Sequence, residues 1–394
     1  IGLCLICMGI QAQSLDSLIR ECLAENRMLA AGQIFAEAAG QMPEQVNVLP
    51  DPEIGINAFV SPVETRLGPQ QLRLGATQML PWKGTIEART KLALFPSLLA
   101  KNEVEKSKID LVWQLKLSYL ELYRVRKSWD IIRKQQGWLE QLRQLALIRM
   151  ESSAGDLASV ARIDLKINEL KWRADQLHLE EQIQILTINQ LCNRPADAPV
   201  ATPDTLTIFF PKGEFQKAFG EHPELRDAEL RQQQSEARIG LIQKERKPSF
   251  GIGLDYIVVG RRSDMNPAGN GRDIVSPRVN IKIPIYGATF DAKLAEQKLT
   301  GEALELRRTD HGNKLEQARS QSRLQWQSAV AECEWIETQL EGLEQLIRLK
   351  TAAFEAGKTP LDSLLELFLE RENYQWRSLQ ARVRSAQAVA AWGR

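Results

Sequence analysis

The side chains with the clearest chemical potential are four carboxylates near the end of the chain: Glu355, Asp362, Glu366 and Glu370. Glu366 and Glu370 are four residues apart, so they share one face if this segment is helical. In a symmetric assembly, each carboxylate that points inward becomes a ring, and such a ring attracts cations. The simpler alternative is a solvated outer face of a helix, with Arg371 nearby.

Other residue types that support catalysis or metal binding are scattered. The histidines are isolated from one another: His178, His222 and His311. The cysteines lack metal-ligand spacing, and spacing alone does not argue for a disulfide among Cys22, Cys192 and Cys333. No nucleophile elbow, P-loop, HExxH or dinucleotide fingerprint is present, since "GIGLDY" places Gly-x-Gly inside an alternating segment. The sequence therefore predicts no enzyme, no cofactor and no metal site.

The overall composition excludes some classes of protein. The 394 residues include 51 basic and 50 acidic side chains, which argues against a nucleic-acid binder. With 43% hydrophobic residues, the composition is not that of a disordered chain. No apolar run reaches about 18 residues, the length that predicts a transmembrane helix.

The first residues, "IGLCLICMGIQAQ", are apolar and then abruptly polar. This pattern is typical of the tail of a secretory signal peptide and predicts cleavage after Ala12, which makes residues 1–12 a signal-peptide remnant. An ordinary buried N-terminal segment is the alternative. Small residues of a lipoprotein cleavage box precede neither Cys4 nor Cys7, so no lipid anchor is predicted.

Two pairs of segments alternate between apolar and polar side chains. The first pair is "PDPEIGINAFV" and "QLRLGATQM", and the second is "KPSFGIGLDYIVVG" and "PRVNIKIPIYG". This period of two predicts β-strands with one apolar face. Both pairs end in the same junction, made of Pro81, Trp82 and Gly84 in the first and Pro284, Tyr286 and Gly287 in the second. Proline ends ladder pairing, and glycine permits the bend into a helix.

Each junction leads into a long stretch with helical spacing. The first runs from about residue 86 to a break at 152–159 and returns to about residue 192. The second runs from about residue 290 to a break at 355–363 and returns to the C-terminus. A shorter helix precedes each strand pair, over about 15–40 and up to about 247. The repeated order indicates a tandem duplication with a first repeat at 13–195, a linker at 196–212 and a second repeat at 213–394.

Four strands are too few to close a barrel by themselves. They are about ten residues long, as tilted membrane-crossing strands are. A membrane barrel needs about eight strands, and lipid does not tolerate open sheet edges. A ring of identical chains would close the sheet. The alternative is a soluble protein in which the strands pack on helices.

These features resemble the TolC family of outer-membrane efflux channels over essentially the whole mature chain. The resemblance rests on "LPDPEIGINAF", "LGATQMLPWKGTIEAR", "KPSFGIGLDY", "VNIKIPIYG" and "AFEAGKTPLDSLLELFLERENY". It implies a mostly α-helical fold with a minor β part: a homotrimer with a twelve-stranded barrel in the outer membrane and a twelve-helix coiled-coil tunnel in the periplasm. The "DPE" and "LPWKG" segments are similar to the branch associated with heavy-metal and cation efflux.

The resemblance also implies partners and contact residues. The loops at 61–70 and 261–277 would face the exterior, and the helix breaks would meet a periplasmic membrane-fusion adaptor that connects to an inner-membrane pump of the RND type. The residues that match this tip motif are Ala154, Gly155, Leu157, Ala356, Gly357, Pro360 and Leu361. Helix-hairpin turns without a docking role are the alternative. Trp82 and Tyr286 would belong to an aromatic belt at the lipid headgroups, or pack ordinarily at a barrel corner.

The resulting hypothesis is a passive outer-membrane channel of a tripartite efflux system. It would export small molecules or metal cations, with the four carboxylates at its periplasmic entrance. The alternative is a periplasmic coiled-coil scaffold whose strands never enter lipid. The sequence does not reveal the cargo, because a duct lined by mixed polar residues need not recognise what passes.

Overall fold

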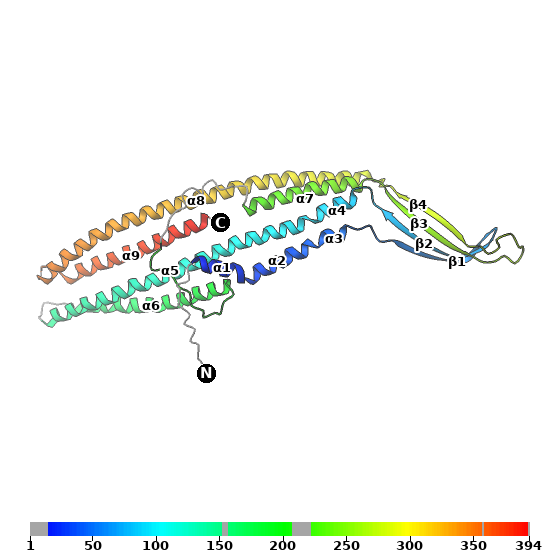
Figure 1. Ribbon diagram of the computed structural model, residues 1–394. Helices are drawn as coiled ribbons and strands as arrows, with labels where there is room; N and C mark the ends of the chain where they lie inside the picture. The colour runs from blue at the N-terminus through cyan, green and yellow to red at the C-terminus, as the bar shows by residue number, and fades with distance from the viewer. Residues whose placement is uncertain (1–14, 152–156, 207–221, 357, 393–394) are drawn as a thin grey trace, which may run out of the picture. The chain divides into compact units, whose positions relative to one another are not determined.

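The computed structural model describes residues 15–151, 157–206, 222–356 and 358–392. The order of elements is the predicted one, with short helices, two strands and a long helical hairpin occurring twice (Figure 1). The first set is α1 (Leu15–Glu25), α2 (Arg27–Gly40), α3 (Met42–Val46), β1 (Glu53–Thr65), β2 (Gly68–Leu80), α4 (Thr85–Ala93), α5 (Phe95–Glu151) and α6 (Leu157–Leu191). The second set is α7 (Pro223–Glu245), β3 (Ser249–Val259), β4 (Ile274–Lys282), α8 (Gly287–Glu355) and α9 (Leu361–Trp392).

Two helices are interrupted where the sequence pattern predicted continuity. The helix expected over about 15–40 breaks at Asn26, whose side chain accepts a hydrogen bond from the Leu29 N–H at 3.0 Å. This local bond competes with the backbone pattern of the helix. The long helix of the first repeat breaks at Leu94. Pro96 follows two residues later and has no N–H to continue the helical ladder.

The predicted loops at 61–70 and 261–277 are too long. The strand β1 continues to Thr65 and β2 begins at Gly68, with Val63 paired to Gln70. Gly68 has a φ of +131°, and its carbonyl accepts a hydrogen bond from the Thr65 hydroxyl at 2.7 Å. Pro62 led to the wrong boundary; it lies where the register shifts, a position at which a strand tolerates proline. In the second repeat, β4 already begins at Ile274.

The chain divides into two compact units, and each contains parts of both sequence repeats. The helical unit comprises Ile1–Ala31, Glu105–Ala218 and Asn313–Arg394. The sheet unit comprises Gly32–Val104 and Phe219–Gly312. No helix of the described residues is long and apolar enough to cross a membrane.

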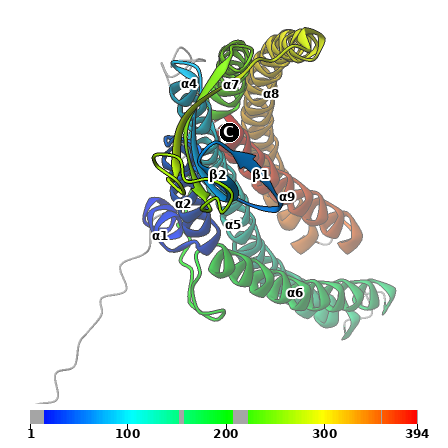
Figure 2. The ribbon, with the colours of Figure 1, turned by 90° about the vertical axis from the view of Figure 1, so that its right-hand side faces the viewer.

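In the helical unit, α6 lies along α5 and α9 lies along α8 (Figures 1 and 2). One apolar core runs through these four helices, with members including Ile132, Ile163, Leu170, Ile347 and Phe368. Ion pairs follow both hairpins, including Arg143 with Asp164 at 2.6 Å and Arg382 with Glu337 at 3.0 Å. The apolar contacts hold the hairpins together, because partly exposed pairs of this kind add little free energy each.

In the sheet unit, the four strands form one antiparallel sheet in the order β1-β2-β3-β4. The central pair β2 and β3 comes from different repeats, and its register places Leu74 opposite Tyr256 and Gly75 opposite Asp255. The strands β1 and β4 are the two edges. The two predicted repeats therefore contribute to a single continuous sheet.

Candidate functional site

The sheet exposes its apolar face, and the polar face is buried at residues of the central strands β2 and β3. Val60 is 98% exposed and Val279 is 70% exposed, and Ile56 lies on the same side. On the opposite face, Asp255 is 3% exposed and Thr77 is 5% exposed. A sheet that folds in water does the reverse, since burial of apolar surface drives folding. This apolar face therefore needs an apolar surrounding from outside the chain.

The polar face carries a network of charged side chains centred on Asp255. The guanidinium of Arg73 donates to one carboxylate oxygen of Asp255 at 2.5 Å. Arg278 approaches the other oxygen at 3.7 Å and donates to the Thr77 hydroxyl at 2.5 Å. Two arginines thus surround one carboxylate, and the cluster has a net positive charge. The network cross-links β2, β3 and β4 through side chains.

Glycines make room for this network. A Cβ at Gly75 would overlap the Asp255 carboxylate, and one at Gly253 would come within 2.9 Å of the Ala76 carbonyl oxygen. Gly55, the register partner of Gly75 on β1, has open space around it instead. The glycines of the polar face at 75 and 253 are therefore required by close approach, whereas the one at 55 is not.

Both edges of the sheet are open. Within the described residues, β1 pairs only with β2 and β4 pairs only with β3. An open edge presents a row of unpaired N–H and C=O groups. Such groups need water or another strand, and lipid provides neither.

The strand-to-helix junctions lie where the sequence placed them. The strand β2 ends directly before Pro81, and Gly84 has a φ of +83° at the start of α4. Trp82 stacks on Phe250 with 6.4 Å between the ring centroids. In the second junction, Pro284 and the exposed Tyr286 occupy the matching positions.

Gly287 departs from the expectation for this junction. It is the first residue of α8 and is not among the described glycines with a positive φ. A Cβ there would meet the Arg246 guanidinium at 3.7 Å, which is ordinary contact. Only the first junction therefore uses the conformational freedom of glycine.

Helix α5 ends at Glu151 and α6 begins at Leu157, while α8 ends at Glu355 and α9 begins at Leu361. Ala154, Gly155 and Gly357 lie outside the described residues. Leu157 begins α6 and is 67% exposed, and Ala356 and Pro360 are also exposed. Leu361 differs because it begins α9 and packs in the apolar core. Leu157, Ala356 and Pro360 are therefore exposed to solvent, whereas Leu361 is buried.

Two arginines join the hairpins near these tips. Arg149 of α5 lies over the Phe354 ring, 3.7 Å from its centroid, and donates to the Phe354 carbonyl. Arg162 of α6 approaches Asp362 of α9 at 3.3 Å. These contacts link the ends of the two helical hairpins to each other.

Of the four predicted carboxylates, Glu355, Glu366 and Glu370 are exposed, while Asp362 pairs with Arg162. Arg371 does not lie with the carboxylates as a solvated neighbour. Its guanidinium lies 4.7 Å from the Phe368 ring centroid, and burial lowers its pKa. Glu366 and Glu370 therefore share an exposed face of α9, as their spacing predicted.

Comparison with known proteins identifies this arrangement. Residues 215–391 match the model of the family described as outer membrane efflux protein. The match covers most of the predicted second repeat. No curated protein matched the chain.

Solved structures extend the likeness to almost the whole chain. A membrane protein from Pseudomonas aeruginosa has a TM-score of 0.79 and 14% identity, covering 96% of this chain and 92% of that one. The outer membrane protein VceC of Vibrio cholerae has a TM-score of 0.75 and 15% identity, covering 96% and 94%. The MtrE outer membrane channel of Neisseria gonorrhoeae has a TM-score of 0.72 and 17% identity, covering 97% and 88%. At these identities the likeness establishes the fold.

The family and the fold confirm the central expectations from the sequence. The chain has the mostly helical fold with a small sheet that the TolC resemblance implied. The matching family is described as outer membrane efflux protein, which agrees with the predicted location.

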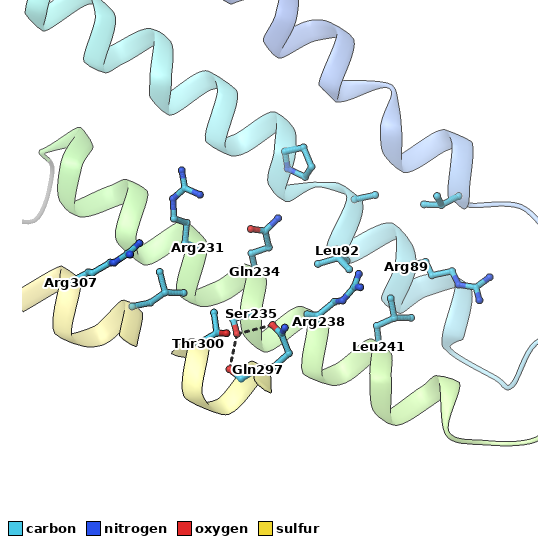
Figure 3. A pocket seen from close by; sticks show the side chains of 14 residues that line it. Arg89, Leu92, Arg231, Gln234, Ser235, Arg238, Leu241, Gln297, Thr300 and Arg307 are labelled. Atoms are coloured by element: carbon cyan, nitrogen blue, oxygen red, sulfur yellow. Dashed lines mark hydrogen bonds between the residues drawn. The ribbon is translucent and has the colours of Figure 1, made fainter. Parts of the chain in front are cut away.

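The chain also has an arginine-lined groove that the sequence did not indicate. The groove has a volume of about 730 Å³, and Arg89, Arg231, Arg238 and Arg307 line it from α4, α7 and α8 (Figure 3). Arg89 pairs with Glu245 at 3.5 Å and Arg231 pairs with Asp227 at 2.6 Å. Guanidinium groups in this arrangement suit carboxylate or phosphate oxygens. These arginines come from three separated segments, so only the tertiary fold reveals the cluster.

His222 and His178 make contacts within their own helices, whereas His311 lies 3.9 Å from Glu224 of α7. The His222 ring accepts a hydrogen bond from the Glu224 N–H at 3.2 Å and caps α7. His178 contacts Gln182 at 3.1 Å, one turn along α6. Among the described residues, no group of three or more histidine, cysteine or acidic side chains is placed to hold a metal ion.

Proposed function

We propose that three copies of this chain form a passive duct through which a tripartite system exports its cargo. The open edges of β1 and β4 pair between neighbouring copies, and the three sheets close a twelve-stranded barrel in the outer membrane. The helical hairpins continue the duct into the periplasm as a twelve-helix tunnel. The chain supplies no energy source, so the pump of the inner membrane drives export.

The main support for this proposal is the exposed apolar face of the sheet. Its exposed face bears Ile54, Val60, Leu254 and Val279, which suit the acyl chains of lipid. Its opposite face bears the network around Asp255, which suits a water-filled interior. A periplasmic scaffold would leave the apolar face in water. Four strands also cannot close on themselves, so the barrel requires further copies.

The tips provide the contact with a periplasmic membrane-fusion adaptor. Leu157, Ala356 and Pro360 are exposed there, and small or apolar side chains permit a partner helix to approach closely. Ala154, Gly155 and Gly357 belong to the same contact by their position in the sequence. The adaptor connects the duct to an inner-membrane pump of the RND type.

The cargo is a small molecule or a metal cation. Three exposed carboxylates, Glu355, Glu366 and Glu370, lie at or near the second tip and would form rings at the periplasmic entrance of a trimer. Such rings raise the local concentration of cations. The duct attracts this cargo electrostatically and need not bind it tightly.

The size and location of the solubilised particle test the proposal. The protein is expected to fractionate with outer membranes and, after detergent extraction, to have the mass of three chains by native mass spectrometry. Association is expected because each copy carries two open strand edges. A single chain in the soluble periplasmic fraction would show instead that the strands stay out of lipid, as the scaffold alternative requires.

A further inference from the structure

Two cysteines that are distant in the sequence meet in the helical unit. Cys22 lies on α1, and Cys192 directly follows the last residue of α6. The fold brings the beginning and the end of the first repeat together at this point. Cys22 is 1% exposed and Cys192 is 0% exposed, and both belong to one apolar cluster that includes Leu18 and Ile188.

Each thiol reaches across to the other segment. The Cys22 thiol lies 3.2 Å from the Leu191 carbonyl oxygen, next to Cys192 in the chain. The Cys192 sulfur lies 4.0 Å from the Leu18 carbonyl oxygen, one turn before Cys22 on α1. The two thiols are close enough for Cys192 to raise the pKa of Cys22. Both cysteines are free thiols in this fold, and each sulfur packs against the backbone next to or one turn from the other cysteine.

An outer-membrane protein reaches its location through the periplasm, which is an oxidising compartment. Buried free cysteines behave as small apolar residues, but an adjacent pair in such a compartment forms a disulfide when it meets an oxidant. We propose that Cys22 and Cys192 form a disulfide bond in the exported protein, which ties α1 to the end of α6. Cys333 lies on α8 and has no part in it.

The oxidation balances as thiol–disulfide exchange with a periplasmic protein of the disulfide-oxidant class. The thiolate of one cysteine attacks the disulfide of the oxidant and forms a mixed disulfide. The thiolate of the second cysteine then displaces the oxidant, which leaves as a dithiol and carries away two electrons. The protons of the two cysteine thiols pass to the oxidant and the solvent, and one S–S bond is formed.

This exchange precedes the docking of α1. In the folded chain, the contact between the two cysteines raises the pKa of the Cys22 thiol and lowers that of the Cys192 thiol, so access to the sulfurs decides the order of events. Both sulfurs are also inaccessible to a protein oxidant once α1 is in place. The bond therefore forms while the chain is still open and persists after folding.

Peptide mapping of the full chain isolated from outer membranes tests the bond. The protein is denatured and alkylated without reductant, digested, and analysed by mass spectrometry. The expected result is a linked peptide pair containing Cys22 and Cys192, with alkylation at Cys333. After reduction, labelling of Cys22 and Cys192 is expected to rise from near zero to the level of Cys333.

Variants keep the test specific. Cys22→Ser is expected to leave Cys192 open to alkylation without reductant, whereas Cys333→Ser is expected to leave the linked pair unchanged. If Cys22→Ser does not accumulate, the wild-type map alone decides. Full alkylation of both cysteines without reductant, or a link from either one to Cys333, would overturn the proposal. The map depends on export and not on pore formation, so it fails independently of the proposed function.

Discussion

Val279→Arg is expected to keep the protein from inserting into the outer membrane, whereas Asn280→Arg is expected to be tolerated. The two residues are neighbours on β4, and they lie on opposite faces of the sheet. Val279 is 70% exposed on the apolar face, so its replacement places a guanidinium in lipid. An arginine on the lipid face of a barrel costs about 2–4 kcal/mol near the midplane, and a trimer would contain three.

Asn280 provides a matched control, because the same residue is introduced one position away. It lies on the same face as Arg278, where an added arginine meets water in the proposed barrel. Fractionation of membranes and the yield of detergent-resistant trimer measure both variants. Equal behaviour of the two variants would mean that the apolar face of β4 does not contact lipid.

Leu157→Asp is expected to weaken capture of the periplasmic adaptor about tenfold or more, which corresponds to about 1.4 kcal/mol. Leu157 is 67% exposed at the start of α6, beside the first tip. An aspartate there would bring a charge into an apolar contact with the adaptor hairpin. The affinity of the purified trimer for the adaptor encoded beside it measures the effect.

Leu165→Asp is the matched control for this change. Leu165 is 72% exposed on the same helix, about two turns away from the tip. Its replacement tests exposure and charge without touching the proposed contact, and both variants are expected to form trimers. The docking role of the tip would be refuted by unchanged capture with Leu157→Asp or by an equal loss with Leu165→Asp.

Periodicity predicted most of the helices and strands of this fold. Alternation in "SFGIGLDY" predicted which face of β3 is apolar, because side chains of a strand alternate regardless of what surrounds it. The position of the junctions followed from Pro81 and Pro284, since proline cannot continue a ladder. Alternation did not predict whether the apolar face is buried or exposed. Val60 and Val279 show that it is exposed.

Sequence patterns did not predict contacts between residues that are distant in the sequence. The pairing of Arg73 with Asp255 depends on the register between strands of different repeats. The meeting of Cys22 with Cys192 depends on where α1 docks against the end of α6. Arg371 was expected near the carboxylates, yet its guanidinium lies over Phe368, because an aromatic ring one turn away competes for it.

Predictions from the local residue type were also wrong at Pro62 and Gly287, where the surrounding structure determines the backbone. Pro62 indicated a long loop, but a register shift admits it within β1. Gly287 resembled Gly84 in sequence, yet only Gly84 has a positive φ. Equivalent sequence in two repeats therefore did not produce the same backbone at the two junctions.

The central claim is that an open four-stranded sheet becomes a pore only when copies of the chain close it in lipid. Conductance across a planar lipid bilayer tests this most directly. Purified trimer added to one side is expected to produce long-lived current steps of uniform size, because a closed barrel leaves a water-filled passage. Protein that binds the bilayer or remains in solution without any such steps would contradict the account.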